Sequence, residues 1–496
     1  MAHKLSIEKV NEVYVRVYSD ASIEAELGDF FTYEVPGARF TPMYRQRMWD
    51  GKIRLYDRMR KSLYFGLAPY VEKFAIDRGY ECEYLSNDIY IRNGVEVDEI
   101  EEFAKALEPS SRGVPIEIRD YQLEAVHKAV DENRTLLLSP TASGKSFIIY
   151  TTMHWHLSFG RKCIIIVPST SLVEQLYADF ADYSSRNGWK VQNHVQKLYS
   201  GFSKDFTKEV LITTWQSVYK MDKRFFNQFD VIFGDEAHQF KAKSLTSCME
   251  KMTNIKYRIG TTGTLDNKKI HKLALEGIFG PVHKVTTTKE LMETGRLSQL
   301  NITCLLMKYD EVTRQGRKNN KYQDEMDFLV TNDRRNNFIR NLACDLKGNT
   351  LVLFQYVKKH GIPLYEAIEE KVGDDKKVFL VSGDVIVSKR EQIRQIATNT
   401  NNNIIVASYG TFSTGINIPS IENVIFASPT KSKIRNLQSI GRGLRLKEGK
   451  DACNLYDIAD DLHWKTWKNH TIKHFAERVK IYSEEKFDYK IAEVKL

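Results

Sequence analysis

The chain has 496 residues, of which 42% are hydrophobic and 11% are aromatic. This length suits about three domains of ~150 residues, and the composition excludes a disordered or fibrous protein. The formal net charge of +9 favours a polyanionic partner, although the excess is modest for a chain of this size.

The six cysteines are scattered singly, without a C-x-x-C pair (Cys82, Cys163, Cys248, Cys304, Cys344, Cys453). This spacing argues against a zinc site and against a disulfide framework, and it favours a reducing compartment. No segment approaches the ~18 consecutive apolar residues that a membrane span requires. We therefore expect a soluble cytoplasmic protein that does not contact a membrane.

Residues 1–110 alternate short apolar runs with charged and aromatic residues, which predicts a small basic α+β domain. The turn-forming residues at 108–113 predict a linker after it. From there to residue 297, β-branched runs alternate with helical patterns, as in a parallel sheet with helices on both faces. The runs are 136–138, 164–167, 210–213 and 231–233.

The same pattern restarts at residue 298 and predicts a second α/β domain up to residue 462, without a second phosphate loop. Its strand-like runs are 351–354, 378–381, 404–406 and 424–426. Residues 310–337 are polar and basic, which indicates an insertion or a surface loop and helix. Residues 463–496 are predicted to form a C-terminal helical extension.

A phosphate-binding loop is predicted between the strand at 136–138 and the helical run at 147–150. It consists of Ser139, Pro140, Thr141, Ala142, Ser143, Gly144, Lys145 and Ser146. In such a loop, backbone amides and the helix N-terminus face the phosphates, Lys145 reaches the β and γ oxygens, and the Ser146 hydroxyl ligates Mg²⁺. The alternative is a chance G-K-S at the start of a helix.

Two adjacent carboxylates, Asp235 and Glu236, follow the strand-like run at 231–233. Phosphoryl transfer needs charge neutralisation and a positioned nucleophile. Asp235 can hold Mg²⁺ through water, and Glu236 can polarise the attacking water. We expect His238 to link this site to residues 260–264. The alternative is an acidic helix N-terminus that complements the macrodipole.

The segment 438–445 predicts a helix in the second α/β domain on which Arg442 and Arg445 share a face. Arginines across a cleft from the γ-phosphate can stabilise the transition state. We assign Gln438, Arg442 and Arg445 to catalysis on this pattern. A solvated basic helix face is the alternative.

From residue 115 to residue 460 the ordered motifs resemble those of a superfamily-2 helicase. The matches are 119–122 (adenine side), 139–146 (motif I), 166–172 (Ia), 213–217, 235–238 (II), 261–265 (III), 354–361 (IV), 407–417 (V) and 438–445 (VI). Ser139 replaces the first consensus glycine, a position that this superfamily commonly relaxes. Asn417 replaces an acidic residue that many members have in motif V.

The resemblance implies two tandem RecA-like parallel-sheet motor domains, 111–297 and 298–462, that use ATP and Mg²⁺. It implies that Tyr121, Gln122 and Gly415 bind nucleotide. More narrowly, residues 39–40, 49–55, 66–67, 460–461 and 482–487 resemble the UvsW-type recombination and repair helicases of T4-like phages. This likeness implies action on forks, Holliday junctions, D-loops and R-loops, in the cytoplasm of a host cell.

The motif matches also imply DNA contacts through hydroxyl and amide side chains, which grip the backbone without reading sequence. These candidates are Ser169, Thr170, Thr214, Gln216, Ser382, Ser408 and Thr411. The implied partners are DNA, RNA–DNA hybrids and replication or recombination proteins, with the chain itself a monomer. Basic residues within 314–335 are further candidates for DNA contact.

Residues 39–64 carry eight cations against two carboxylates, with Tyr44, Trp49, Tyr56 and Tyr64 interleaved. The cations are Arg39, Arg45, Arg47, Lys52, Arg54, Arg58, Arg60 and Lys61, and we select the first five as DNA contacts. Cations neutralise phosphates and aromatic rings stack on unpaired bases. Alternatively, the rings form the domain's own core and the arginines are merely solvated.

The expected function is thus an ATP-dependent DNA helicase that remodels branched DNA. Three alternatives remain: a double-strand translocase or RNA-directed helicase, a non-motor DNA-binding scaffold with a vestigial ATPase, and the motor subunit of a restriction enzyme.

Overall fold

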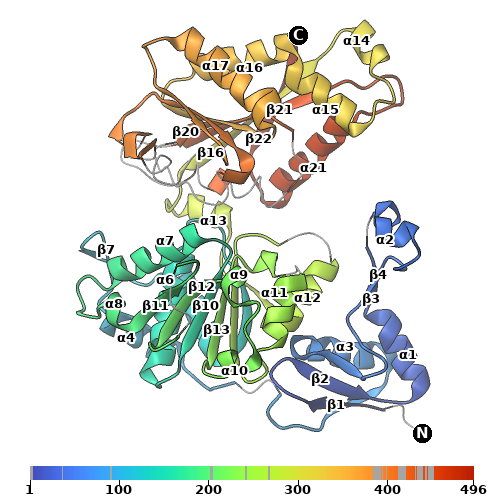
Figure 1. The fold of residues 1–496 in the computed structure, drawn as a ribbon, viewed down its shortest axis with the longest axis vertical. Coiled ribbons are helices and arrows are strands. Elements are labelled where there is room, and N and C mark those ends of the chain that lie inside the picture. The colour runs from blue at the N-terminus through green and yellow to red at the C-terminus, as the bar shows by residue number, and fades with distance from the viewer. Residues whose placement is uncertain are drawn as a thin grey trace. The chain divides into compact units, whose positions relative to one another are not determined.

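The computed structural model of the protein divides into two compact units (Figure 1). One unit comprises Met1–Ser139 and Gly144–Val285, and the other comprises Thr286–Leu496 together with Pro140–Ser143 of the predicted phosphate loop. The structure describes residues 4–35, 37–89, 92–201, 205–240, 243–265, 269–383, 392–393, 395–397, 399–411, 421–429, 432, 440–441, 444 and 452–496. Within these residues, no helix is long and apolar enough to cross a membrane.

The N-terminal domain is a four-stranded sheet with helices on one face. The strand order is β5 (Ser62–Tyr64), β2 (Tyr14–Tyr18), β1 (Lys4–Lys9) and β6 (Glu81–Tyr84), and the helices are α1 (Ala21–Phe30), η2 (Phe65–Leu67) and α3 (Ala68–Arg78). Alternate residues of a strand face opposite sides of a sheet. Val15 and Val17 of β2 are therefore buried in the core beneath Leu27 of α1 and Phe74 of α3.

A two-stranded arm, residues 32–54, projects from this domain (Figure 1). It contains β3 (Thr32–Glu34), η1 (Ala38–Phe40), α2 (Pro42–Arg45) and β4 (Lys52–Arg54). β3 pairs with β4 in antiparallel register, and Thr41 caps α2. Large apolar side chains such as Phe40 and Met48 are exposed on the arm.

The first α/β domain is built on a seven-stranded parallel sheet. The strand order is β11 (Val195–Leu198), β12 (Val210–Thr214), β10 (Cys163–Val167), β13 (Val231–Asp235), β14 (Tyr257–Thr262), β9 (Arg134–Leu138) and β15 (Val282–Lys284). Its helices are α5 (Asp120–Asp131), α6 (Lys145–Ser158), α7 (Thr170–Tyr183), α8 (Val191–His194), α9 (Trp215–Val218), α10 (Lys223–Phe226), η3 (Ala237–Gln239), α11 (Lys243–Glu250) and α12 (Lys269–Phe279).

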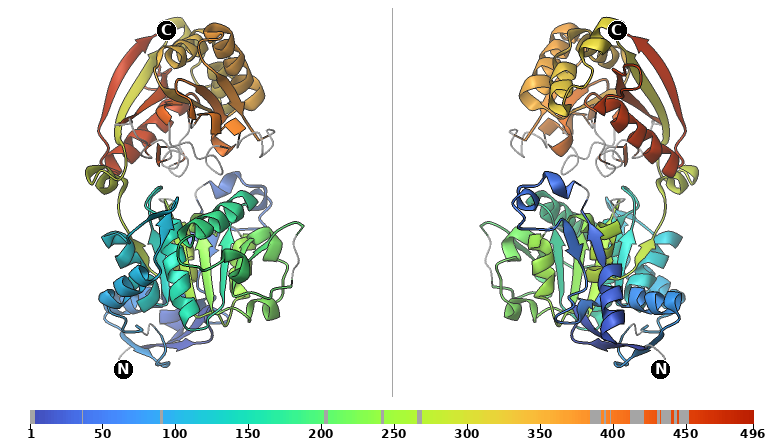
Figure 2. Two further views of the ribbon diagram at one scale, coloured as in Figure 1. Left: turned by 90° about the vertical axis from the view of Figure 1, so that its left-hand side faces the viewer. Right: turned by 90° about the vertical axis from the view of Figure 1, so that its right-hand side faces the viewer.

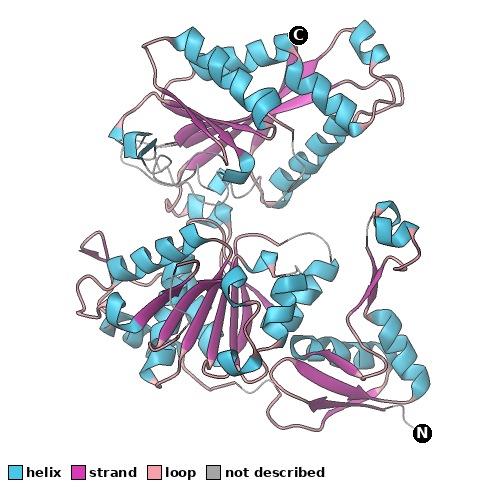
Figure 3. Cartoon of the chain, in the orientation of Figure 1, coloured by secondary structure: helices cyan, strands magenta, loops and turns pink. Residues whose placement is uncertain are grey.

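Helices cover both faces of this sheet, and each face has its own core (Figures 2 and 3). On β10, Ile165 packs with α6 and α7, while Ile164 packs on the opposite side with α11 and α12. The uninterrupted apolar strands of the sequence are thus explained by burial on two faces.

A connecting segment packs on the first α/β domain rather than on the N-terminal sheet. It contains α4 (Val97–Ala106), β7 (Ser110–Ser111) and β8 (Val114–Pro115). Ile100 of α4 is fully buried in the same core as Val126 of α5, and the Ser110 hydroxyl donates to the Asp182 carbonyl of α7.

The N-terminal domain is docked on α12 of the first α/β domain. A Cβ atom on Gly66 would lie 1.9 Å from the carbonyl oxygen of Glu276, so only glycine fits there. The Tyr70 hydroxyl donates to Glu276 Oε2 at 2.7 Å, and Leu273 is buried in the N-terminal core. These contacts hold the two domains together as one body.

The second α/β domain has another seven-stranded parallel sheet. The strand order is β18 (Val378–Val381), β19 (Ile404–Ser408), β17 (Asn349–Phe354), β20 (Ile421–Phe426), β21 (Ala452–Asp461), β16 (Gln299–Lys308) and β22 (Tyr489–Lys495). The described helices are α13 (Thr288–Glu293), α14 (Glu311–Gly316), α15 (Tyr322–Thr331), α16 (Asp333–Asp345), η4 (Val357–Gly361), α17 (Ile362–Val372) and α21 (His470–Glu484). The predicted α/β fold class is confirmed.

The tail contains the expected helix, α21, but its last residues form the edge strand β22, which pairs with β16 in parallel. The residues of β22 are almost all exposed, so the sequence carries no run of buried apolar residues to announce a strand.

Candidate active site

The predicted phosphate loop connects the end of β9 to the start of α6. Gly144 at its end has a φ of +86°, and a Cβ atom there would lie 2.3 Å from Gln122 Nε2. Conformation and space both require glycine. Gln122, which the sequence assigned to nucleotide binding, thus lies directly against the loop. The Lys145 ammonium donates to the Ser139 carbonyl at 3.2 Å.

The two predicted carboxylates lie at the carboxyl end of β13. Asp235 pairs in register with Thr261 of β14, and the Thr261 hydroxyl donates to Asp235 Oδ1 at 2.7 Å. Glu236 turns the chain out of the strand with a φ of +51°. β14 pairs with both β13 and β9, so the carboxylates and the phosphate loop share one edge of the sheet.

Burial raises the pKa of the Asp235 carboxyl, and the adjacent Glu236 charge raises it further, while the Lys145 ammonium opposes both effects. The single Lys145 ammonium cannot neutralise both neighbouring carboxylates, so the site has room for a further positive charge. Oxygen ligands in such a setting suit Mg²⁺. The donor set therefore fits the divalent cation that the sequence led us to expect.

Sequence reasoning missed Tyr183, at the end of α7. Its hydroxyl lies 2.9 Å from the hydroxyl of Ser146, the predicted metal ligand. Burial raises the pKa of Tyr183, which keeps it a neutral phenol able to donate or accept a hydrogen bond. No motif of the sequence marks this residue, because it comes from a helix 37 positions further along the chain.

His238 lies where the sequence predicts a link to residues 260–264. Its Nδ1 is 3.0 Å from the Thr262 hydroxyl and 3.2 Å from Glu236 Oε2. The imidazole therefore joins the end of β14 to the second carboxylate.

Four candidate DNA contacts of the first α/β domain border one cavity of about 880 Å³ at the carboxyl ends of β10, β11 and β12. They are Ser169, Thr170, Thr214 and Gln216. Ser169 caps α7, and the Thr214 hydroxyl is 2.9 Å from that of Ser217. Trp215, Tyr219 and Lys220 also line this cavity.

The three candidates of the second α/β domain also lie together. Ser382 directly follows β18 and Ser408 ends the neighbouring strand β19. The Ser408 hydroxyl is 2.8 Å from that of Thr411. All three side chains are buried. Gly415, Asn417, Gln438, Arg442 and Arg445 lie outside the described residues.

The basic and aromatic residues of the N-terminal domain differ in their exposure to solvent. Arg39, Arg45, Arg47, Lys52 and Arg54 are exposed on the arm. Tyr44 is exposed too, whereas Tyr56 is buried in the core. Trp49 is half-buried and donates from Nε1 to the Lys52 carbonyl at 2.8 Å.

Among the basic residues at 314–335, Arg335 lies in the interior. It is fully buried and pairs with Asp460, with 2.8 Å between Nε and Oδ1. It also donates to the Ala427 carbonyl. Arg335 is therefore a structural cation of the second domain. Arg314 lies over the ring of Trp464, 5.9 Å from its centroid.

The two parallel sheets and the shared edge of loop and carboxylates define the class of protein. The Res subunit model of type III restriction enzymes matches residues 115–267, and the helicase conserved C-terminal domain matches residues 334–447. The chain is a superfamily-2 helicase that depends on ATP.

The particular family follows from three further comparisons. The N-terminal domain model of DNA helicase UvsW matches residues 5–84. The ATP-dependent DNA helicase UvsW of Enterobacteria phage T4 is 34% identical, over 97% of this chain and 98% of its own. The crystal structure of T4 UvsW aligns with a TM-score of 0.53 and 32% identity over 99% of both chains. The chain belongs to the UvsW family of DNA helicases.

A more distant likeness concerns the fold alone. The DNA-bound type ISP restriction-modification enzyme LlaBIII matches 77% of this chain and 32% of its own, with 17% identity and a TM-score of 0.57.

Proposed function

We propose that this helicase remodels branched DNA, namely forks, Holliday junctions, D-loops and R-loops, and that Mg²⁺ accompanies ATP. The observation that carries the proposal is the arm, with five exposed cations on a domain docked to the first motor domain. Cations on a projecting element can engage the phosphates of a second DNA arm while the motor holds the first.

The proposed catalytic roles follow the geometry of the shared edge. Lys145 binds the phosphates, Ser146 and Asp235 hold the metal ion, and Glu236 positions the attacking water. Bound Mg²⁺ would neutralise charge on the phosphates. Arg442 and Arg445, with Gln438, act on the γ-phosphate, and Tyr121 and Gln122 bind the base. Gly415 and the other residues of loop 139–146 complete the nucleotide site.

We further propose that Ser169, Thr170, Thr214 and Gln216 contact the DNA backbone. Their position around one cavity supports this role. Ser382, Ser408 and Thr411 would continue the contact on the second motor domain. We place the end of the DNA-contacting N-terminal domain before α4, because α4 packs on the first motor domain.

A strand-displacement panel tests the substrate. Forks, four-way junctions, D-loops, DNA–RNA hybrids and RNA duplexes of equal length are incubated with the protein and ATP. We expect branched DNA to be unwound at least tenfold faster than a linear duplex. Equal rates on linear and branched DNA, or preferential unwinding of RNA duplexes, would refute the proposal.

A triple variant tests whether the preference for branched DNA depends on the arm. Replacing Arg39, Arg45 and Arg47 with glutamine removes three exposed charges far in sequence from the ATP site. We expect loss of branched-DNA preference with unstimulated ATP hydrolysis unchanged.

A further inference from the structure

The sheet of the N-terminal domain has one face that its helices leave uncovered. On β2, Val15 and Val17 point into the core, so Tyr14, Arg16 and Tyr18 point to the opposite face. Tyr64 of β5 lies directly opposite Tyr14 in the antiparallel pair. This face therefore presents three aromatic rings around one arginine.

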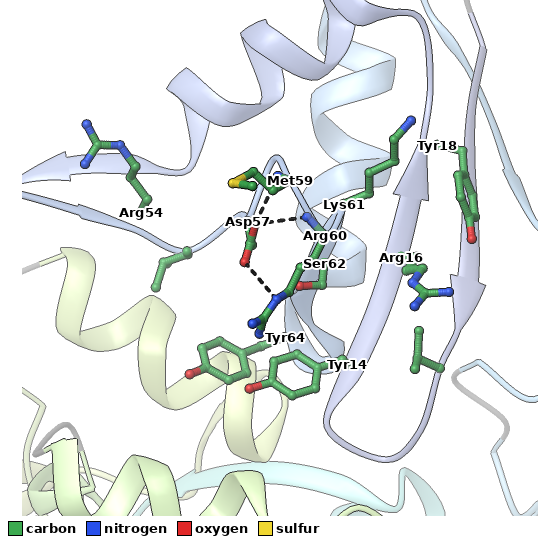
Figure 4. Close-up of a pocket in the computed structure, with 12 residues that line it drawn as sticks. Tyr14, Arg16, Tyr18, Arg54, Asp57, Met59, Arg60, Lys61, Ser62 and Tyr64 are labelled. Atoms are coloured by element: carbon green, nitrogen blue, oxygen red, sulfur yellow. Dashed lines mark hydrogen bonds and ion pairs between the residues drawn. The ribbon is translucent and has the colours of Figure 1, made fainter.

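A cavity of about 640 Å³ lies on this face (Figure 4). The sheet forms one wall, and the segment from Arg54 to Ser62 forms the other. The cavity falls within the 300–1,000 Å³ usual for small-ligand sites, which leaves room for a base and its phosphate.

Stacking and hydrogen bonds hold the aromatic rings of the cavity in place. Tyr14 and Tyr64 stack with their centroids 5.4 Å apart and their planes 18° apart. The Tyr64 hydroxyl donates to Glu250 Oε1 of α11 at 2.6 Å. Tyr18 stands beside them on the same strand, and its hydroxyl donates to Glu8. Rings fixed in this way lose little entropy when a ligand stacks on them.

Four cations border the cavity against a single carboxylate, that of Asp57. Arg54 pairs with Asp50 and Lys61 with Glu24, and Arg60 lies 3.8 Å from Asp57. The Arg16 side chain has no hydrogen-bond or ion-pair partner among the residues that the structure describes. It is exposed and so is available to an anion from outside.

Acidic residues occupy the other half of the same face. Glu8 lies opposite Arg16 on β1, and Glu83 of β6 binds Ser6 and Lys4. Negative charge there repels a polyanion, so the favourable part of the face is limited to β2 and β5. A ligand of one or two nucleotides fits this limit better than a duplex lying across the whole sheet.

We propose that this cavity holds an unpaired nucleotide of single-stranded DNA, with its base on the tyrosine rings and its phosphate at Arg16. The inference rests on the proposed function and deepens it, because it assigns to the N-terminal domain a contact with single strands at the branch point. Sheet faces with exposed rings bind single strands by stacking, which depends little on base identity.

The test is a double-mutant cycle between the protein and the DNA. The affinity of the full chain is measured for forks with an unpaired gap at the junction, in which an abasic site is moved one position at a time. The loss of one stacked base weakens binding about tenfold. At one abasic position we expect the affinity of wild type for the fork to fall about tenfold. The affinity of Tyr18→Leu, already weakened, should not change when the same base is removed.

Tyr18→Phe keeps the ring and removes only the bond to Glu8, so it should bind as wild type does. Arg16→Gln should weaken binding several-fold, whereas Lys73→Gln removes an exposed cation from α3, on the covered side of the sheet, and should have no effect. The inference would be overturned if, at every position, an abasic site lowered the affinity of wild type and of Tyr18→Leu by the same factor. So would a dependence on Arg16 without any dependence on Tyr18, which indicates phosphate contact alone.

Failure of this inference is distinguishable from failure of the proposed function. If wild type shows no preference for forks, the proposed function fails. If wild type unwinds forks and the cycle is additive, only the assignment of the cavity fails.

Discussion

At the residue scale, the pair of carboxylates at the end of β13 has two separate environments. Asp235 is tied to Thr261, whereas Glu236 leaves the strand in a left-handed conformation and faces His238. Such a difference allows one carboxylate to serve as a ligand and its neighbour to act on water.

Glu236→Gln should bind ATP as wild type does and hydrolyse it at least a hundredfold more slowly, because the amide cannot polarise water as the carboxylate does. Binding of a fluorescent ATP analogue and DNA-stimulated phosphate release measure the two effects. Retained hydrolysis would contradict the role of Glu236.

The hydrogen bond between the Tyr183 and Ser146 hydroxyls leads to a second prediction. Groups that orient a metal ligand typically change metal affinity 10- to 100-fold when removed. We expect Tyr183→Phe to raise the Mg²⁺ concentration for half-maximal nucleotide binding about tenfold, with little change at saturating Mg²⁺. Ser146→Ala should show a larger shift, and the double variant no additional one. Additive shifts would show that Tyr183 acts independently of Ser146.

At the element scale, α12 connects the ATP site to the N-terminal domain. Its last residue, Phe279, packs so closely on β13 and β14 that a Cβ atom on Gly234 would lie 2.5 Å from the ring. One turn earlier, Glu276 and Gly277 contact Tyr64, Gly66 and Tyr70 of the N-terminal domain. A single helix therefore packs against the strand that carries Asp235 and against the N-terminal domain.

Gly66→Ala should disturb this docking, because its methyl group would overlap the Glu276 carbonyl. Forced overpacking typically costs 1–3 kcal/mol. We expect a lower urea midpoint and faster proteolysis between the N-terminal sheet and α4. Gly316→Ala is the control, because a Cβ atom there meets nothing within 4 Å. Equal urea midpoints and proteolysis rates for the two variants would mean that the interface accommodates the methyl group without loss of stability.

The sequence predicted the buried strands well and the exposed ones poorly. The runs 164–167 and 231–233 fall inside β10 and β13, because strands buried on both faces are continuously apolar. β22 was missed because nearly all of its residues face solvent and its stability comes from backbone pairing with β16. Chain order places helix α4 in the N-terminal domain, but its contacts show that it packs on the first α/β domain.

The same distinction holds for the candidate site. The positions of Lys145 and Asp235 at one edge of the sheet were predictable, because the loop and the strand that carry them can be recognised from local sequence. Tyr183 depends on tertiary packing, as does the burial of Arg335 against Asp460, and neither contact leaves a local pattern.

At the scale of the whole molecule, buried neutral histidines predict sensitivity to acid. Burial, together with the nearby Arg161 charge, lowers the pKa of His156 to about 3. Burial likewise lowers the pKa of His360 to about 3 and that of His154 to about 4. Unfolded histidines take up protons near pH 6.5, so folding stability is lost as the pH falls from about 6.5 towards 4.

Arg161 donates a hydrogen bond to His156 Nδ1 at 3.0 Å. His156→Gln should reduce the loss of stability at low pH, because glutamine does not titrate and its amide oxygen can still accept this bond. Between pH 7 and pH 5.5, wild type should lose about 1 kcal/mol more than the variant. Urea midpoints at the two pH values measure the difference. His271→Gln, at a half-buried position, is the control and should retain the full acid loss.

The docking of the N-terminal domain on α12 also determines what a footprint on DNA would look like. The cavity beside Tyr18 and the cavity bordered by Ser169 belong to one body. Docking on α12 would therefore keep their spacing constant while ATP is hydrolysed. If both cavities hold DNA as proposed, the N-terminal domain would set a fixed number of nucleotides between the branch point and the first motor contact with DNA.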